Sequence, residues 1–198
     1  MQKLYESEEY ISNLRLFTES FETRFVEMAT VDADRSVRVA TIALLDTIRQ
    51  RDLMEPDAVD KVSLMIFDPE SRIRKAVVNL FLSNVEATYE ETLESIGGNV
   101  ETVEAELGND KETADGIPYT WLKYNSLVKV LAKYDRQVEE LEQAEKPEEG
   151  NKLPLKGFEF GDVESRIAMA STAIVGEMEE LHVLPETRID LTSRTGII

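Results

Sequence analysis

The chain has no cysteine and one histidine in 198 residues, and these scarcities exclude several kinds of chemistry. Without cysteine there is no thiolate nucleophile, and the absence also fits a reducing compartment. The single histidine, His182, cannot form a metal-binding cluster, and its place near the end of a predicted helix favours an interaction with terminal carbonyl groups. A glycine-rich phosphate-binding loop is missing too. The sequence therefore predicts a protein that is not an enzyme, with no cofactor and no metal.

Long apolar runs are also missing. The longest, Val62–Phe67, contains Ser63 and is far shorter than the ~20 residues of a membrane-spanning helix. The first residues include no basic stretch leading into an apolar segment, so no secretory signal is visible. We therefore expect no membrane contact.

Basic residues are scarce in the middle of the chain. Residues 84–150 carry 17 acidic and 6 basic side chains, whereas residues 1–83 carry 15 and 11. The whole chain, with a net charge of −18, repels a phosphate backbone. The best candidate for a local DNA contact is the basic strip of Arg72, Arg74 and Lys75. The overall charge favours a different role for this strip, as a solvated helix start whose arginines bond neighbouring loops.

What the chain does contain is a repeated nine-residue pattern. It reads Asp68-Pro-Glu-Ser-Arg-Ile-Arg-Lys-Ala76 and again Asp162-Val-Glu-Ser-Arg-Ile-Ala-Met-Ala170. A looser copy at 32–40 lies 36 residues before the Asp68 copy, so in chain order the copies at 32, 68 and 162 are the first, second and third. Self-similarity at a fixed period indicates a solenoid, which works by presenting surface to partners. We expect the recurring aspartates to cap helices or to bond an arginine of the adjacent repeat, with Arg38 and Arg74 completing these ladders. Paired acid and base catalysis is the less favoured interpretation.

Apolar spacing predicts an all-α, HEAT-like solenoid of about three helix pairs with long acidic insertions. Helices are predicted from Tyr10 to Met28 and from Val37 to Ile48, and Pro56 introduces another over Asp57–Phe67. Residues 84–96 could either extend the helix that begins after the Asp68 turn or follow it as a separate segment. The expected organisation is HEAT-like repeats over 1–96, an acidic loop over 97–116, a helix over 117–136, a mobile linker over 137–160, and over 161–198 a repeat helix from about Asp162 to Leu181 with a C-terminal segment.

The first 83 residues resemble a known family. The resemblance is carried by the runs Leu4-Tyr5, Leu14-Arg-Leu-Phe-Thr-Glu-Ser-Phe21, Arg24-Phe-Val-Glu-Met28 and Val37-Arg-Val-Ala-Thr-Ile42. These runs are similar to the stromalin conservative domain of the stromal antigen family, the HEAT-repeat subunits of cohesin. The resemblance implies a nuclear, chromosome-associated scaffold that binds the kleisin subunit, the cohesin loader and regulatory peptides in sister-chromatid cohesion and chromatin loading.

The resemblance also implies an aromatic pocket for short regulatory peptides. Carried over residue by residue, this pocket would draw on Tyr5, Phe17, Thr18, Phe21 and Arg24. The sequence departs from the family at Ser20, where many members have arginine, and the family's pocket tryptophan belongs to a stretch before this chain's first residue. From periodicity alone, Phe17 and Phe21 would be core residues of an amphipathic stripe, so the residues leave both assignments open.

A rival interpretation is a generic HEAT scaffold of the transport-receptor or phosphatase-subunit type. Such a scaffold would receive basic peptides on an acidic inner face. The run Leu16–Phe21 separates the two interpretations, because a transport scaffold offers no particular reason for it. The chain also resembles a piece of a longer array, so we expect apolar surface at its ends and some self-association.

Overall fold

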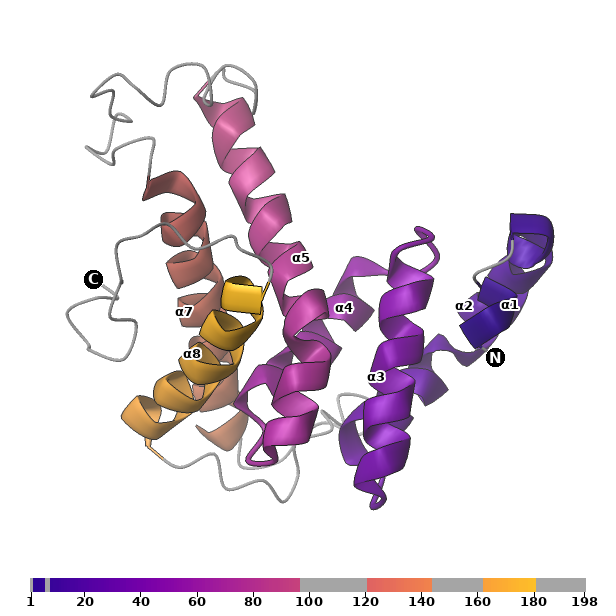
Figure 1. Cartoon of the computed structure of the whole chain (residues 1–198), viewed down its shortest axis with the longest axis horizontal. Coiled ribbons are helices and arrows are strands. Elements are labelled where there is room, and N and C mark those ends of the chain that lie inside the picture. Colours follow the sequence, from indigo (N-terminus) through magenta and orange to yellow (C-terminus); the bar gives the residue numbers. More distant parts are fainter. Residues whose placement is uncertain (1, 6–7, 97–120, 144–161, 181–198) are drawn as a thin grey trace. The chain divides into compact units, whose positions relative to one another are not determined.

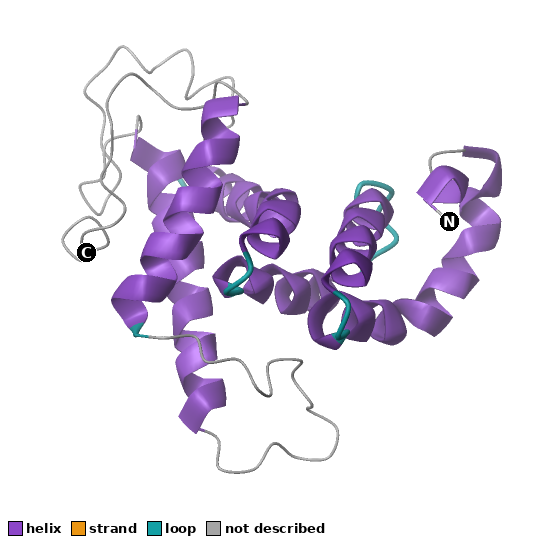
Figure 2. Ribbon diagram, turned by 60° about the horizontal axis from the view of Figure 1, so that its bottom comes forward, coloured by secondary structure: helices purple, strands orange, loops and turns teal. Residues whose placement is uncertain are grey.

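A computed structural model of the chain describes residues 2–5, 8–96, 121–143 and 162–180. Every regular element in these ranges is a helix (Figure 1, Figure 2), which confirms the predicted all-α helical-repeat fold. The chain divides into two units, Met1–Phe81 together with Val138–Ile198, and Leu82–Gln137. The first unit contains both α2 and the repeat turns, so it holds all of the predicted partner-binding and DNA-contact residues.

The first unit begins with the short helix α1 (Gln2–Tyr5) and the long helix α2 (Glu8–Val31). The predicted helix from Tyr10 to Met28 is therefore confirmed. One side of α2 packs against α1, α3 and α4, where Phe25 and Ala29 are buried. Thr30 is also buried, and its hydroxyl donates to the carbonyl oxygen of Val26 at 2.6 Å, so this donor is satisfied in the interior.

Helix α3 (Arg35–Arg49) starts where the first repeat turn supplies an N-cap. The Asp34 carboxylate accepts the backbone N–H of Ser36 at 2.7 Å, and Asp32 accepts the N–H of Asp34 at 2.9 Å. A turn then reverses the chain after α3, with Asp52 in the left-handed region at φ 53°. Aspartate tolerates this conformation better than most side chains, which suits a tight turn.

The second repeat begins with α4 (Pro56–Ser63), which continues as the 3₁₀-helix η1 (Leu64–Phe67). Proline occupies the first turn of α4 as predicted, since its missing N–H would have no helical partner there. The N–H of Glu55, which precedes the helix, donates to the Glu22 carboxylate of α2 at 2.9 Å. All four residues of η1 are buried, and η1 contacts α8. The tighter 3₁₀ turn thus ends this helix inside the core.

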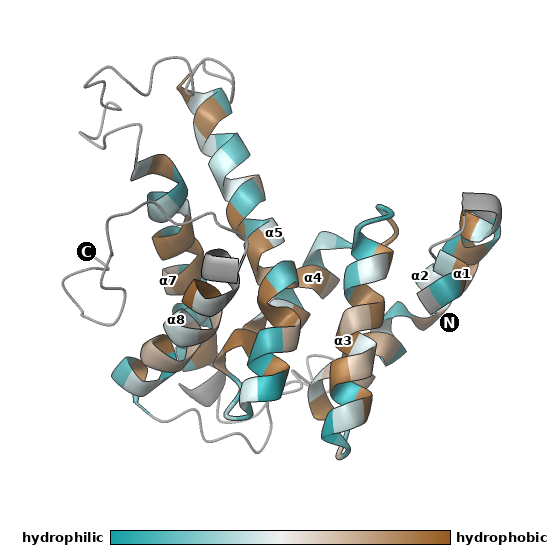
Figure 3. Cartoon of the chain, viewed as in Figure 1, coloured by the Kyte–Doolittle hydropathy of each residue, from teal (hydrophilic) through white to brown (hydrophobic). Residues whose placement is uncertain are grey.

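The remaining described helices are α5 (Ser71–Ser95), α7 (Leu122–Gln143) and α8 (Val163–Glu180). Both α5 and α7 contribute to the two units, because each runs past a unit boundary. The core of the second unit includes Tyr89, Leu93 and Leu122, with Ile96 packed against them. Along α3 and α5, apolar and polar positions alternate in Figure 3, as expected for helices with one buried side.

The structure also bears on the predicted segments outside the repeats. Residues 84–95 do extend the preceding helix, as part of α5. The stretch Gln137–Gln143, which the sequence assigned to the linker, is the last part of α7. The acidic loop over 97–116, the rest of the linker, His182 and the C-terminal segment lie outside the described residues. None of the described helices is long and apolar enough to cross a membrane.

Candidate functional site

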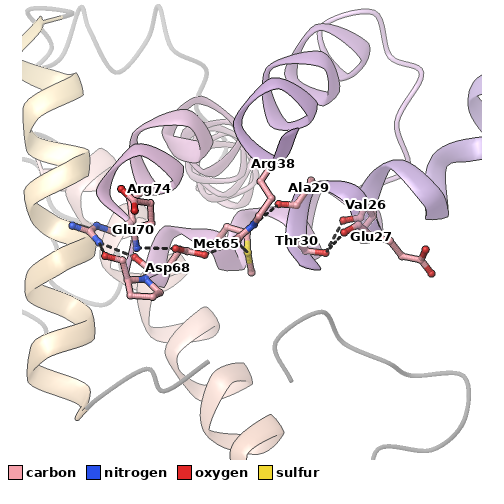
Figure 4. Close-up of polar contacts among 10 residues, drawn as sticks. Val26, Glu27, Ala29, Thr30, Arg38, Met65, Asp68, Glu70 and Arg74 are labelled. Atoms are coloured by element: carbon pink, nitrogen blue, oxygen red, sulfur yellow. Dashed lines mark hydrogen bonds and ion pairs between the residues drawn. The ribbon is translucent and has the colours of Figure 1, made fainter. Parts of the chain in front are cut away.

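The second repeat turn is joined to the first repeat by a buried arginine–aspartate pair (Figure 4). Arg38 of α3 and Asp68 are both almost fully buried, and the guanidinium Nη2 donates to the Asp68 carboxylate. Arg38 also donates from Nε to the carbonyl oxygen of Ala29 at 3.2 Å and contacts the sulfur of Met65. The second carboxylate oxygen of Asp68 accepts the N–H of Glu70 at 2.8 Å. Both oxygens are thus engaged in structure, which agrees with the predicted ladder.

The basic strip separates into one engaged and two exposed side chains. Arg74 donates from Nη1 to the carbonyl oxygens of Asp68 and Pro69, at 2.7 and 2.9 Å, and so closes its own repeat turn. Arg72 and Lys75 are exposed on α5. A DNA contact by this strip would therefore rest on Arg72 and Lys75. Arg74 bonds a loop instead, which is the alternative role that the sequence predicted for the arginines of the strip.

The third copy of the pattern supplies the start of α8. The Asp162 carboxylate accepts the backbone N–H of Ser165 at 2.8 Å, and this hydrogen bond lowers the pKa of Asp162 below its ordinary value. Arg166 is 2% exposed and lies 3.9 Å from the carboxylate of Glu139 on α7. Its counterpart in the second copy is the exposed Arg72, so matching residues of the pattern take different positions in the two repeats.

Two of the predicted pocket residues, Tyr5 and Thr18, lie in the interior. They are at most 1% exposed, and their hydroxyl oxygens are 2.9 Å apart. Thr18 donates its own hydrogen to the carbonyl oxygen of Leu14 at 2.8 Å, so the Tyr5 hydroxyl is the donor to Thr18. This hydrogen bond links α1 to α2. In a docking surface it would hold the helices in place and would not itself contact a partner.

Phe17 and Phe21 lie at the boundary between core and solvent. With Phe25 they form a continuous aromatic row, with ring centroids 4.7 Å apart for the first pair and 6.5 Å for Phe21 and Phe25. Exposure rises from the buried Phe25 through the half-buried Phe17 to Phe21, which is 46% exposed. Phe17 is therefore closer to the predicted core position, and Phe21 is closer to the predicted surface position.

Tyr10 extends this row along the same side of α2, because spacings of seven and four residues return to one face of a helix. We call Tyr10, Phe17 and Phe21 the aromatic ridge. Tyr10 is 44% exposed, close to the value for Phe21. Arg24 is exposed beside the ridge and forms an ion pair with Glu27 at 2.9 Å. The ridge therefore offers apolar ring surface, bordered by charge, to a partner side chain.

Other polar contacts in the structure have no signal in the sequence. Glu22, which binds the N–H of Glu55 ahead of α4, is one acidic residue among many on α2. The burial of Arg166 also has no signal in the sequence, because arginine is ordinarily exposed. Among the described residues, no group of three or more histidine, cysteine, aspartate or glutamate side chains is placed to hold a metal ion.

Two known proteins are similar to this chain. Cohesin subunit psc3 of Schizosaccharomyces pombe is 28% identical over 131 residues, which are 66% of this chain and 13% of that protein. Sister-chromatid cohesion protein 3 of Arabidopsis thaliana is 35% identical over 80 residues, or 40% of this chain and 7% of that protein. The resemblance to the stromal antigen family of cohesin is confirmed.

The likeness to cohesin subunit psc3 is wider than the first 83 residues, since 131 aligned residues cannot fit within them. The chain spans a small part of these relatives, 13% and 7% of their lengths. No family model matches the chain, and no solved structure matches it. The described geometry and these two similarities are thus the basis for any functional proposal.

Proposed function

We propose that this chain is a segment of a non-catalytic cohesin scaffold that acts in sister-chromatid cohesion. The observation that carries the proposal is the similarity to two proteins named for cohesin and for sister-chromatid cohesion. Its partners would be the kleisin subunit and chromatin-associated regulators, including the cohesin loader, on chromosomes in the nucleus. The helical-repeat fold supports this role, because such arrays act by displaying docking surfaces.

The aromatic ridge is the proposed contact for a partner segment. An apolar side chain that packs against Phe21 would remove nearly half of this ring from water, with Phe17 and Phe25 fixed behind it. The buried bond between Tyr5 and Thr18 keeps α1 in place, so the surface needs little ordering when a partner binds. Arg24 could exchange its exposed ion pair with Glu27 for an acidic group of the partner.

The second candidate function is a generic HEAT scaffold of the transport-receptor or phosphatase-subunit type, but no described contact favours it. Its expected feature is an acidic face for basic peptides, whereas the exposed large apolar side chains of the described residues include the aromatic Tyr10, Phe21 and Trp121. The two similar proteins are also both named for cohesion. We therefore place peptide docking at the aromatic ridge ahead of capture of basic cargo.

Calorimetric titration with the central segment of a cohesin kleisin tests the proposal. We expect saturable binding, and we expect Phe21→Ala to weaken it by roughly thirtyfold, the effect of losing ~2 kcal/mol at a central aromatic contact. The matched control is Leu16→Ala, because Leu16 is 73% exposed and lies about 140° around α2 from Phe21. This control should bind like the wild type.

Circular dichroism must first show that both variants keep the helical content of the wild type. Equal weakening by Phe21→Ala and Leu16→Ala would contradict a specific role for the ridge. Absence of binding by the folded wild-type chain would contradict kleisin docking by this segment, and the generic scaffold would then be the better explanation.

A further inference from the structure

A second exposed aromatic surface lies in the unit Leu82–Gln137, apart from the aromatic ridge. Trp121, immediately before α7, is 48% exposed, and its ring centroid lies 6.1 Å from that of Tyr124, with an angle of 59° between the rings. We call Trp121 and Tyr124 the aromatic pair. An indole exposed to this degree leaves a large ring face in water, so covering it with a ligand is favourable.

The packing next to the aromatic pair brings the end of α5 beside the start of α7. Leu122, the first residue of α7, packs with Tyr89 and Leu93 of α5 in the core of this unit. This last part of α5 carries three exposed glutamates, at positions 90, 91 and 94. The carboxylates and the aromatic pair therefore lie at the same end of the two helices.

The lysine at this end of the two helices already has a contact. The Lys123 Nζ lies 5.1 Å from the centroid of the Tyr89 ring, in a cation–π contact between α7 and α5. Over residues 84–150 the sequence has 17 acidic and 6 basic side chains. The electrostatic field at this surface thus attracts a cationic ligand and repels both an acidic peptide and a nucleic-acid backbone.

Arginine is the cationic side chain that suits this surface best. Its guanidinium is planar and weakly hydrated, so it can stack on an indole that is still open to water. The compact ammonium of lysine is strongly hydrated and gains less from such a contact. A guanidinium stacked on Trp121 also keeps N–H groups at its edge, and carboxylates are the acceptors that match them.

We infer that the aromatic pair binds an arginine side chain of a basic polypeptide segment, with the guanidinium stacked on Trp121. Charge complementarity selects this occupant, because the exposed glutamates of α5 attract a basic segment and the exposed indole favours arginine within it. The inference goes beyond the proposed function, since the aromatic pair lies in the other unit and shares no residue with the aromatic ridge.

Trp121 is the single tryptophan in the sequence, so its fluorescence reports on this surface alone. The probe is a labelled twelve-residue peptide in which three arginines are separated by glycine and serine, titrated into the full chain. We expect a saturable change in tryptophan emission. The same peptide with lysine at the three positions has equal charge, and it should bind about fivefold more weakly. Trp121→Ala should weaken binding of the arginine peptide by a similar factor, measured by fluorescence anisotropy of the label.

The matched control is Phe21→Ala, because Phe21 is 46% exposed and belongs to the aromatic ridge. This variant should bind the arginine peptide like the wild type, which separates this test from that of kleisin docking. Circular dichroism must show that Trp121→Ala keeps its helical content, and Trp121→Phe should retain part of the affinity because it keeps a ring face.

Three results would each overturn the inference. The first is equal binding of the arginine and lysine peptides, which would indicate attraction by net charge alone. The second is a tryptophan emission that stays unchanged at saturating arginine peptide. The third is binding of the arginine peptide to folded Trp121→Ala with the affinity of the wild type.

Discussion

At the scale of single residues, the same position of the repeated pattern has different roles in different copies. Asp68 bonds an arginine of the preceding repeat, whereas Asp162 caps its own helix. Arg72 is exposed, and its counterpart Arg166 is buried. The pattern predicted that these residues are structural, and it predicted the Arg38 ladder. It could not predict burial, because burial depends on which neighbouring helix covers each position.

The buried pair of Arg38 and Asp68 leads to a prediction about stability. Arg38→Met should lower the free energy of unfolding by about 3–5 kcal/mol, since it leaves the Asp68 carboxylate buried without its cation. Asp68→Asn should also destabilise, because the uncharged amide leaves the guanidinium unpaired. The double variant should lose less than the sum of the two, since each single change strands the other partner. Urea unfolding followed by circular dichroism measures all three.

A more exposed ion pair between α3 and the same repeat turn provides the control. Arg35 is mostly exposed and contacts Glu70 at 3.0 Å, so Arg35→Met should cost less than about 1 kcal/mol. If Arg38→Met destabilises no more than Arg35→Met, the buried ladder does not hold the two repeats together.

At the scale of elements, the sequence predicted which segments are helices better than how they end. The spacing of apolar residues sufficed for α2 and α3, because each has a single apolar stripe. The change from α4 to the 3₁₀ turn η1 was not predicted, since all of Leu64–Phe67 is buried and a continuous apolar run carries no period. Charged residues at 137–143 suggested a linker, but they continue α7.

The N-terminus of α8 leads to a prediction about pH. Because the hydrogen bond from Ser165 lowers the pKa of Asp162 in the folded state, the ionised carboxylate stabilises the helix start. This stabilisation is fully present above the pKa of the unfolded chain and is lost as the pH falls through the folded-state pKa. Asp162→Ala should therefore lower the melting temperature at pH 7, and the difference from wild type should shrink toward strongly acidic pH.

Asp162→Asn separates the cap from the charge. Asparagine retains a side-chain acceptor for the Ser165 N–H, so this variant should be more stable than Asp162→Ala and should lack the pH-dependent part. Thermal melts of the three proteins from pH 7 to pH 2 give the comparison, since the lowered pKa lies toward the acidic end of this range. A difference between wild type and Asp162→Ala that stays constant over this range would show that the carboxylate's ionisation contributes nothing.

At the scale of the whole molecule, the candidate docking site was predictable in its residues but not in its exposure. Phe17, Phe21 and Phe25 share one helical stripe, and periodicity treats them alike. They differ because α1, α3 and α4 cover only part of α2, which buries Phe25 and leaves Phe21 46% exposed. The contact between Tyr5 and Thr18, 13 residues apart, also depends on tertiary packing. Resemblance to a family pointed to Tyr5, Phe17, Thr18 and Phe21, and packing determines which of them are buried and which are exposed.

The net charge of −18 bears on the candidate DNA contact. If the strip on α5 neutralises phosphates, only Arg72 and Lys75 are exposed to do so, because Arg74 closes its own turn. Replacing both with glutamine should weaken binding to duplex DNA and flatten its dependence on salt, by roughly one unit of logarithmic slope for each removed cation. Titrations at several salt concentrations, monitored by fluorescence anisotropy, measure both quantities.

The control for this experiment is Lys61→Gln, which removes one exposed cation from α4 instead of α5. A contact localised at the strip predicts that the double variant changes the slope and that Lys61→Gln does not. If all three proteins share one affinity and one slope, Arg72 and Lys75 make no phosphate contact. That result would fit the net charge of the chain, whose own field repels the DNA backbone.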